Sequence, residues 1–160
     1  MTEIAIHQAL REAVVEVLEK MFFIEASEQP VSEGAPEGPA VTVELTFDGD
    51  PPGVFRMSLA RAATALIAAD FLGEDPELLT ESQADDVAKE LANMICGAVL
   101  SRIESSATFR LGAPDLVMGD IDAGSTIRGT VCAVQTGSGI LTAEIHTETK
   151  ACSRTQKSAS

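Results

Sequence analysis

A helix-forming segment followed by a pair of strand-like segments occurs twice along this chain of 160 residues. Residues 3–23 place apolar side chains at spacings of three and four, which predicts an amphipathic helix. Apolar and polar residues then alternate over 41–47 and 55–59, and the turn residues D-G-D-P-P-G stand between them. We therefore expect a hairpin there, preceded by a Pro-, Gly-, Ser- and Glu-rich loop over 28–39.

A second helix-forming region follows in two pieces. Residues 61–72 are rich in Ala, and Gly73 stands where a helix commonly ends. Thr80 lies three residues before Gln83, which is the spacing of a capping box. The sequence therefore predicts a short helix and then a longer one that begins after Thr80 and reaches about Glu104.

Strand patterns return beyond this longer helix. Alternation is present over 107–111 and again over 127–134 and 140–147, where the residues T-G-S-G at 136–139 supply a turn. Because a helix is again followed by a hairpin, the two halves indicate a weak internal duplication. The pattern and the chain length predict a single α/β (α+β) domain over residues 1–148.

Charge and composition exclude several classes of partner. The formal net charge of −14 argues against nucleic acid and anionic membranes, because phosphates attract Lys and Arg. No apolar run approaches the roughly 18 residues of a membrane helix, and the first residues do not resemble a signal peptide. We therefore expect a protein partner and a cytoplasmic location. Residues 149–160, polar and basic, are expected to form a disordered tail.

Residues that serve other enzyme classes are poorly arranged in this chain. The spacing of Cys96, Cys132 and Cys152 suits neither a disulfide framework nor a zinc site, so we expect reduced thiols that fill the core. His7 and His146 are distant in sequence and indicate no catalytic triad. Neither of the common glycine-rich nucleotide-binding motifs is present.

The helix expected after Thr80 carries a polar stripe opposite its apolar face. The stripe consists of Asp86, Glu90, Asn93, Gly97, Ser101 and Glu104. Asn is a mediocre helix former, and a Gly within a helix costs about 1 kcal/mol relative to Ala. Two unfavourable residues on one stripe suggest a surface that another molecule approaches closely. Packing of another element of the same chain against Gly97 would explain the glycine equally well, and an ordinary solvated face would explain Glu90.

The string E-L-A-N-M-I-C-G at 90–97, preceded by Asp86, resembles the signature of the CheC/CheX/FliY family of chemotaxis phosphatases. In that family an acidic residue or Ser precedes a Glu and an Asn on one helix, and a Pro follows some twenty residues later. Pro114 follows Asn93 by 21 positions, slightly fewer than is usual. Since the first-helix counterpart of the motif, at 16–19, has no Asn, a single site is expected, as in the CheX-like branch.

The resemblance implies two long helices packed on a mainly antiparallel sheet with a pseudo-two-fold helix-hairpin repeat. The motif helix would face outward, often within a homodimer. The implied substrate is the aspartyl phosphate of a CheY-type response regulator, which would supply its own Mg2+, so no cofactor is expected on this chain.

The resemblance also implies roles for the motif residues. Asn93 would accept a hydrogen bond from the attacking water and donate one to a phosphoryl oxygen. Glu90 would pair with a Lys of the regulator, and Asp86, Gly97 and Ser101 would form the surrounding docking surface.

Two other functions remain open at this point. The chain could be a non-catalytic CheX-like interaction module that binds a signalling protein without changing its phosphorylation. It could also be a structural dimeric domain whose polar stripe is its own subunit interface.

Overall fold

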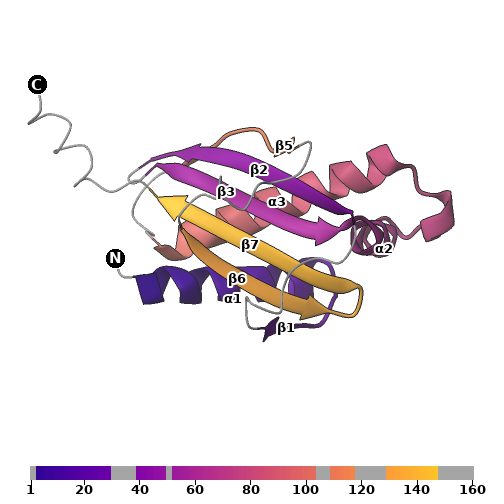
Figure 1. Ribbon diagram of the computed structural model, residues 1–160, viewed down its shortest axis with the longest axis horizontal. Helices are drawn as coiled ribbons and strands as arrows, with labels where there is room; N and C mark the ends of the chain where they lie inside the picture. The colour runs from indigo at the N-terminus through magenta and orange to yellow at the C-terminus, as the bar shows by residue number, and fades with distance from the viewer. Residues whose placement is uncertain (1–2, 30–38, 50–51, 104–108, 118–128, 148–160) are drawn as a thin grey trace, which may run out of the picture.

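Two long helices, α1 (Glu3–Met21) and α3 (Glu81–Ile103), lie against one face of an antiparallel sheet in the computed structural model of the chain (Figure 1). The shorter α2 (Arg61–Leu72) lies at one end of the sheet and is joined to α3 through a single 3-10 turn, η2 (Pro76–Leu78). The structure describes the following residues: 3–29, 39–49, 52–103, 109–117 and 129–147.

The sheet has seven strands in the order β1-β6-β7-β3-β2-β4, with β5 also pairing with β2. The strands are β1 (Ala26–Gln29), β2 (Ala40–Asp48), β3 (Gly53–Ala60), β4 (Arg110–Leu111), β5 (Asp115–Leu116), β6 (Thr130–Thr136) and β7 (Gly139–Thr147). All pairings among them are antiparallel, and the β2–β3 and β6–β7 hairpins meet at the central β3–β7 pair. The mainly antiparallel sheet is therefore confirmed, whereas the pseudo-two-fold relation of the halves stays a prediction.

Alternation along the strands decides which face of the sheet is buried. In β2 the apolar residues Val41, Val43, Leu45 and Phe47 are buried, while the polar residues between them point to the other face. The buried faces of the strands and of α1 and α3 share one hydrophobic core. Ala, Val, Leu and Ile supply most of this core, as a chain without Trp or Tyr requires.

The longer helix begins where the capping box predicts. The backbone N–H of Gln83 donates to Oγ1 of Thr80 at 3.1 Å, and the backbone N–H of Thr80 donates to Oε1 of Gln83 at 2.9 Å. These reciprocal bonds satisfy backbone donors that the first turn of a helix leaves free. Gly73 likewise ends α2 in the left-handed conformation, with φ of 68°.

The end of α1 has a residue that the sequence does not lead one to expect. Phe23 adopts a φ of 57°, in the left-handed region where Gly is the usual residue. The backbone N–H of Ile24 donates to the carbonyl of Leu18 at 2.9 Å, which closes a seven-residue turn around the left-handed Phe23. This turn buries Phe22 and Ile24 and leaves Phe23 87% exposed.

The loop prediction over 28–39 is wrong at its start, because Glu28 and Gln29 belong to β1, which pairs with β6. Of the strand expected over 107–111, only residues 109–111 are described, and β4 covers Arg110–Leu111; β5 was not predicted at all. Such short strands form because a long neighbouring strand offers free backbone groups, and a two-residue segment has no periodicity to reveal it. The expected tail at 149–160 lies outside the described residues.

Candidate functional site

The polar stripe of α3 faces away from the sheet. Asp86, Glu90 and Ser101 are exposed, and Asn93 and Gly97 are half-buried. The opposite side of the helix lies in the core; its buried residues are Ala84, Val87, Ala88, Leu91, Ala92, Ile95, Cys96, Val99, Leu100 and Ile103. This buried face includes Cys96, as expected, and also Leu100. Met94 and Ala98 are only partly buried.

Glu90 and Asn93 lie next to each other on this surface, since residues three apart on a helix are neighbours. Neither side chain, nor that of Asp86, makes a hydrogen bond or ion pair with another residue of the described ranges. A carboxylate and a carboxamide are thus presented side by side with their polar atoms unused. Such groups can bind a partner without first breaking an internal contact.

The surface above Gly97 is open. A Cβ placed on Gly97 would meet no atom within 4 Å in the described part of the chain. No described element of the chain therefore packs against this glycine. One turn further on, the Oγ of Ser101 donates to the Gly97 carbonyl at 3.0 Å, which holds the hydroxyl close to the helix. The stripe from Asp86 to Ser101 extends about 22 Å along α3, and Glu104 lies outside the described residues.

On α1, the residue that corresponds to Glu90 is Glu16, and its environment differs. Glu16 of α1 accepts a hydrogen bond from Nη2 of Arg102, which joins α1 to α3. Glu16 is therefore occupied by an internal ion pair, whereas Glu90 has no such partner among the described residues. The expectation of a single site, on α3, stays a prediction.

The stripe lies on the outward surface of a helix, and no stripe residue lines either of two clefts among the described residues. One of these clefts, of about 430 Å³, lies between α1 and β1 and is bordered by Arg102. None of its lining residues belongs to the stripe. Since small-molecule sites are concave, a protein suits the stripe better as a ligand.

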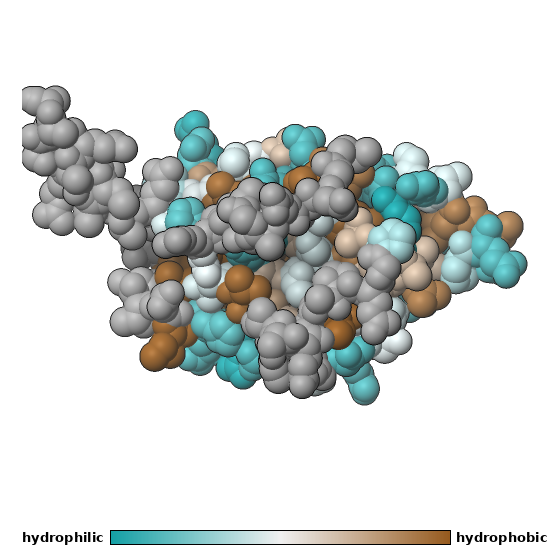
Figure 2. Space-filling view, viewed as in Figure 1, coloured by the Kyte–Doolittle hydropathy of each residue, from teal (hydrophilic) through white to brown (hydrophobic). Residues whose placement is uncertain are grey.

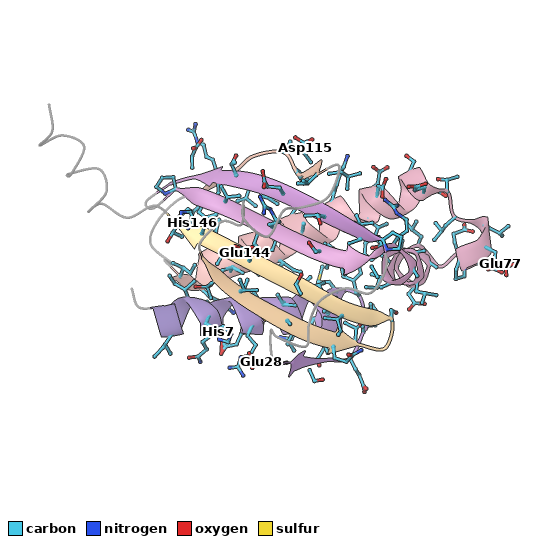
Figure 3. All side chains as sticks on the ribbon, in the orientation of Figure 1. His7, Glu28, Glu77, Asp115, Glu144 and His146 are labelled. Atoms are coloured by element: carbon cyan, nitrogen blue, oxygen red, sulfur yellow. The ribbon has the colours of Figure 1, made fainter. Side chains whose placement is uncertain are left out.

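Cys96, Cys132 and His7, which are further candidate reactive groups, are buried or paired. Cys96 and Cys132 are buried and free, as expected, and burial raises the pKa of Cys96 to about 12 and that of Cys132 to about 11. Both thiols are therefore neutral at physiological pH and poor nucleophiles; Cys152 lies outside the described residues. His7 faces Glu28, with 3.4 Å between Nε2 and Oε2 (Figure 3).

Within the described ranges no three His, Cys, Asp or Glu side chains are grouped as a metal site. In the same ranges, no helix has the length and apolar character needed to cross a membrane.

Sequence reasoning missed a charged row on the sheet face opposite the helices. Arg56 of β3 lies in register between Glu44 of β2 and Glu144 of β7, and its Nε donates to Oε2 of Glu44 at 3.0 Å. Burial raises the pKa of Glu144, and the charges of Arg56 and His146 oppose this shift (Figure 3). Only the strand register brings these residues together, so no local motif could have revealed the row.

Comparison with known proteins bears on the whole fold. The family model described as chemotaxis phosphatase CheX matches residues 41–134. No curated protein matches the chain significantly. The CheX crystal structure from Vibrio vulnificus is 23% identical, with a TM-score of 0.70 over 92% of this chain and 99% of that one. A CheX from Desulfovibrio desulfuricans is 22% identical, with a TM-score of 0.66 over 89% and 99%.

A further similar structure is that of a complex. The CheX–CheY–BeF3–Mg2+ complex from Borrelia burgdorferi contains a chain that is 16% identical to this one. The TM-score is 0.67, and the match covers 92% of this chain and 99% of that chain. At these identities the matches establish the fold, and the family model establishes the family.

Proposed function

Because the chain belongs to the CheX family of chemotaxis phosphatases, we propose that it hydrolyses the aspartyl phosphate of a CheY-type response regulator. The observation that carries this proposal is the pair formed by Glu90 and Asn93. They are neighbours on the outward face of α3, neither has a partner among the described residues, and the space above Gly97 is open. The CheX–CheY complex from Borrelia burgdorferi supports a CheY-type protein as the partner.

The proposed reaction makes modest demands on the phosphatase. Water attacks phosphorus in line, the bond from phosphorus to the aspartyl oxygen breaks, and inorganic phosphate and the free carboxylate are formed. An acyl phosphate is already reactive, so positioning of water and balance of charge are the main requirements. The Asn93 carboxamide meets them, since its oxygen accepts a hydrogen bond from the water and its NH2 donates to a phosphoryl oxygen.

The remaining stripe residues hold the regulator in place. Glu90 pairs with a Lys at the regulator's active site, which sets the distance of Asn93 from the phosphoryl group. Asp86, Gly97 and Ser101 form the docking surface around this pair. The regulator supplies Mg2+, in keeping with the Mg2+ of the Borrelia complex.

The test is the decay of a CheY-type regulator from the same organism after phosphorylation by acetyl phosphate. The wild-type chain should accelerate the decay, and Asn93→Ala should remove most of the acceleration, on the order of 100-fold, because a group that acts in the transition state is lost. Gln8→Ala is the matched control, since it removes an exposed carboxamide from α1 and should leave the rate unchanged. Circular dichroism establishes that both variants are folded.

Two results would contradict the proposal. If the wild type accelerates the decay of no regulator from the organism but binds one, the chain is a non-catalytic interaction module. If chains associate through Glu90 and Asn93 themselves, so that crosslinks at these positions join two copies, the stripe is a subunit interface.

A further inference from the structure

The polar stripe is too small to hold a protein partner by itself. A specific interface contains roughly 20–30 residues on each side, with apolar anchors at its centre. The described part of the stripe contains Asp86, Glu90, Asn93, Gly97 and Ser101, and none of these has a large apolar side chain. Docking of the proposed regulator must therefore extend onto a surface that borders the stripe.

The two neighbours of α3 on the helical side of the molecule differ in character. Along α1, the surface around the 430 Å³ cleft is lined mainly by charged residues, including Arg11, Glu12 and Glu19. By contrast, the C-terminal ends of α1 and α2 together expose an apolar patch. The patch consists of Met21 (52% exposed), Phe23 (87%), Phe71 (40%) and Leu72 (43%).

The patch joins the ends of α1 and α2, and α2 in turn contacts α3. The rings of Phe22 and Phe71 stack with their centroids 4.5 Å apart, so the ends of α1 and α2 are in contact. At the start of α2, Nη1 of Arg61 lies 2.9 Å from Oδ1 of Asp85 on α3. Leu72 follows Arg61 by about three helical turns and so lies on the same side of α2, the side toward α3. Figure 2 shows hydrophobic residues at the end of the molecule where α2 and η2 lie.

Phe23 is a poor choice for the position that it occupies if only folding matters. Its left-handed backbone favours Gly or Asn, and its ring contributes little to the core because it is 87% exposed. A Gly at position 23 would end the helix with less backbone strain. A strained backbone that presents an aromatic ring to solvent points to a function for that ring, and aromatic rings are frequent anchors of protein interfaces.

We infer that the apolar patch formed by Met21, Phe23, Phe71 and Leu72 is the apolar half of the regulator's docking surface. The inference rests on the proposed function and extends it from the reacting centre to the means of recognition. Glu90 and Asn93 then address the regulator's active site, while the patch binds an apolar surface beside that active site. The combination supplies the apolar anchor and the polar contacts that a transient signalling interface requires.

The test compares Phe23→Asn and Leu72→Ser with Ile4→Ser as the matched control. Asn tolerates the left-handed backbone, so Phe23→Asn should fold at least as well as the wild type. Ile4 is also exposed, at 80%, but lies at the opposite end of α1, roughly 25–30 Å from Phe23. The ligand is the CheY-type regulator carrying BeF3 and Mg2+, and its Kd is measured by calorimetry. The KM and kcat for dephosphorylation of the acetyl-phosphate-treated regulator are measured alongside.

Phe23→Asn and Leu72→Ser should each raise Kd and KM about tenfold, with a smaller effect on kcat, while Ile4→Ser should change neither constant. If the wild type binds and dephosphorylates the regulator and both patch variants match it, the docking surface is wrong and the proposed function stands. If the wild type neither binds nor dephosphorylates any regulator, both proposals fail. If the patch variants instead convert a dimer to a monomer in sedimentation, with regulator binding unchanged, a second copy of the chain covers the patch and the inference is overturned.

Discussion

Gly97 stands in the middle of α3, where nothing in the described structure packs against it. A glycine that is needed neither for a turn nor for close packing inside the chain weakens its helix without a structural return. The adjacent residues Glu90 and Asn93 are similarly unused by the fold, since neither has an internal partner among the described residues. The described part of the fold therefore gives no structural reason for these three residues, which is in keeping with the proposed contact with a regulator.

Replacement of Gly97 separates its effect on stability from its effect on binding. Gly97→Ala should raise the free energy of unfolding by about 1 kcal/mol, because Ala is the better helix former and its Cβ would enter open space. Urea unfolding at equilibrium measures this change. A larger side chain in Gly97→Leu should also leave the fold intact but weaken binding of the activated regulator. A loss of stability in Gly97→Ala would instead show that part of the chain packs on this surface.

Among the elements, the strands place charged side chains together on the sheet face that does not contact the helices. Glu44, Arg56 and Glu144 come from three strands and form one row on the sheet face opposite the helices. Arg56 donates to Glu44 and also lowers the cost of charging Glu144, yet burial outweighs that effect and the pKa of Glu144 is raised. Folding therefore makes the ionised form of this carboxyl less favourable.

The raised pKa of Glu144 predicts a pH dependence of stability. The native state binds the proton of Glu144 more tightly than the unfolded state, so this group's contribution to stability falls as the pH rises above the ordinary Glu pKa. Glu144→Gln should therefore gain stability relative to the wild type between pH 4 and pH 7, as measured by urea unfolding at each pH. The exposed Glu77→Gln serves as the control and should show no such trend. A gain that is the same at both pH values would contradict the assignment.

For the whole molecule, the central position of β7 in the sheet leads to a prediction about truncation. All described elements lie within residues 3–147, and β7 pairs with both β3 and β6. Removal of residues 149–160 should therefore change the free energy of unfolding by less than about 0.5 kcal/mol. A chain that ends at residue 138 loses β7 and should not fold cooperatively. Circular dichroism and urea unfolding of the two shortened chains measure both outcomes, and a large loss on removal of 149–160 would show that this segment stabilises the domain.

Much of the architecture is local in origin and could be predicted from the sequence. The spacing of apolar residues predicts α1 and α3, the Thr80–Gln83 capping box gives the start of α3, and Gly73 gives the end of α2. Alternation predicts both hairpins. The polar stripe on α3 follows from helical geometry alone, because residues three and four apart share a face. These features depend on a few neighbouring residues, whose preferences agree with the final fold.

Tertiary structure decided everything that depends on pairing across long distances in the chain. The β1–β6 pair, the two-residue strands β4 and β5 and the row around Arg56 exist only because a neighbouring strand lies in one particular register. The left-handed Phe23 follows from the need to bury Phe22 and Ile24 on either side of it. The sequence by itself thus determined the helices, the hairpins and the polar stripe. Packing decided which surfaces stay open beside that stripe, because exposure depends on what the rest of the chain covers.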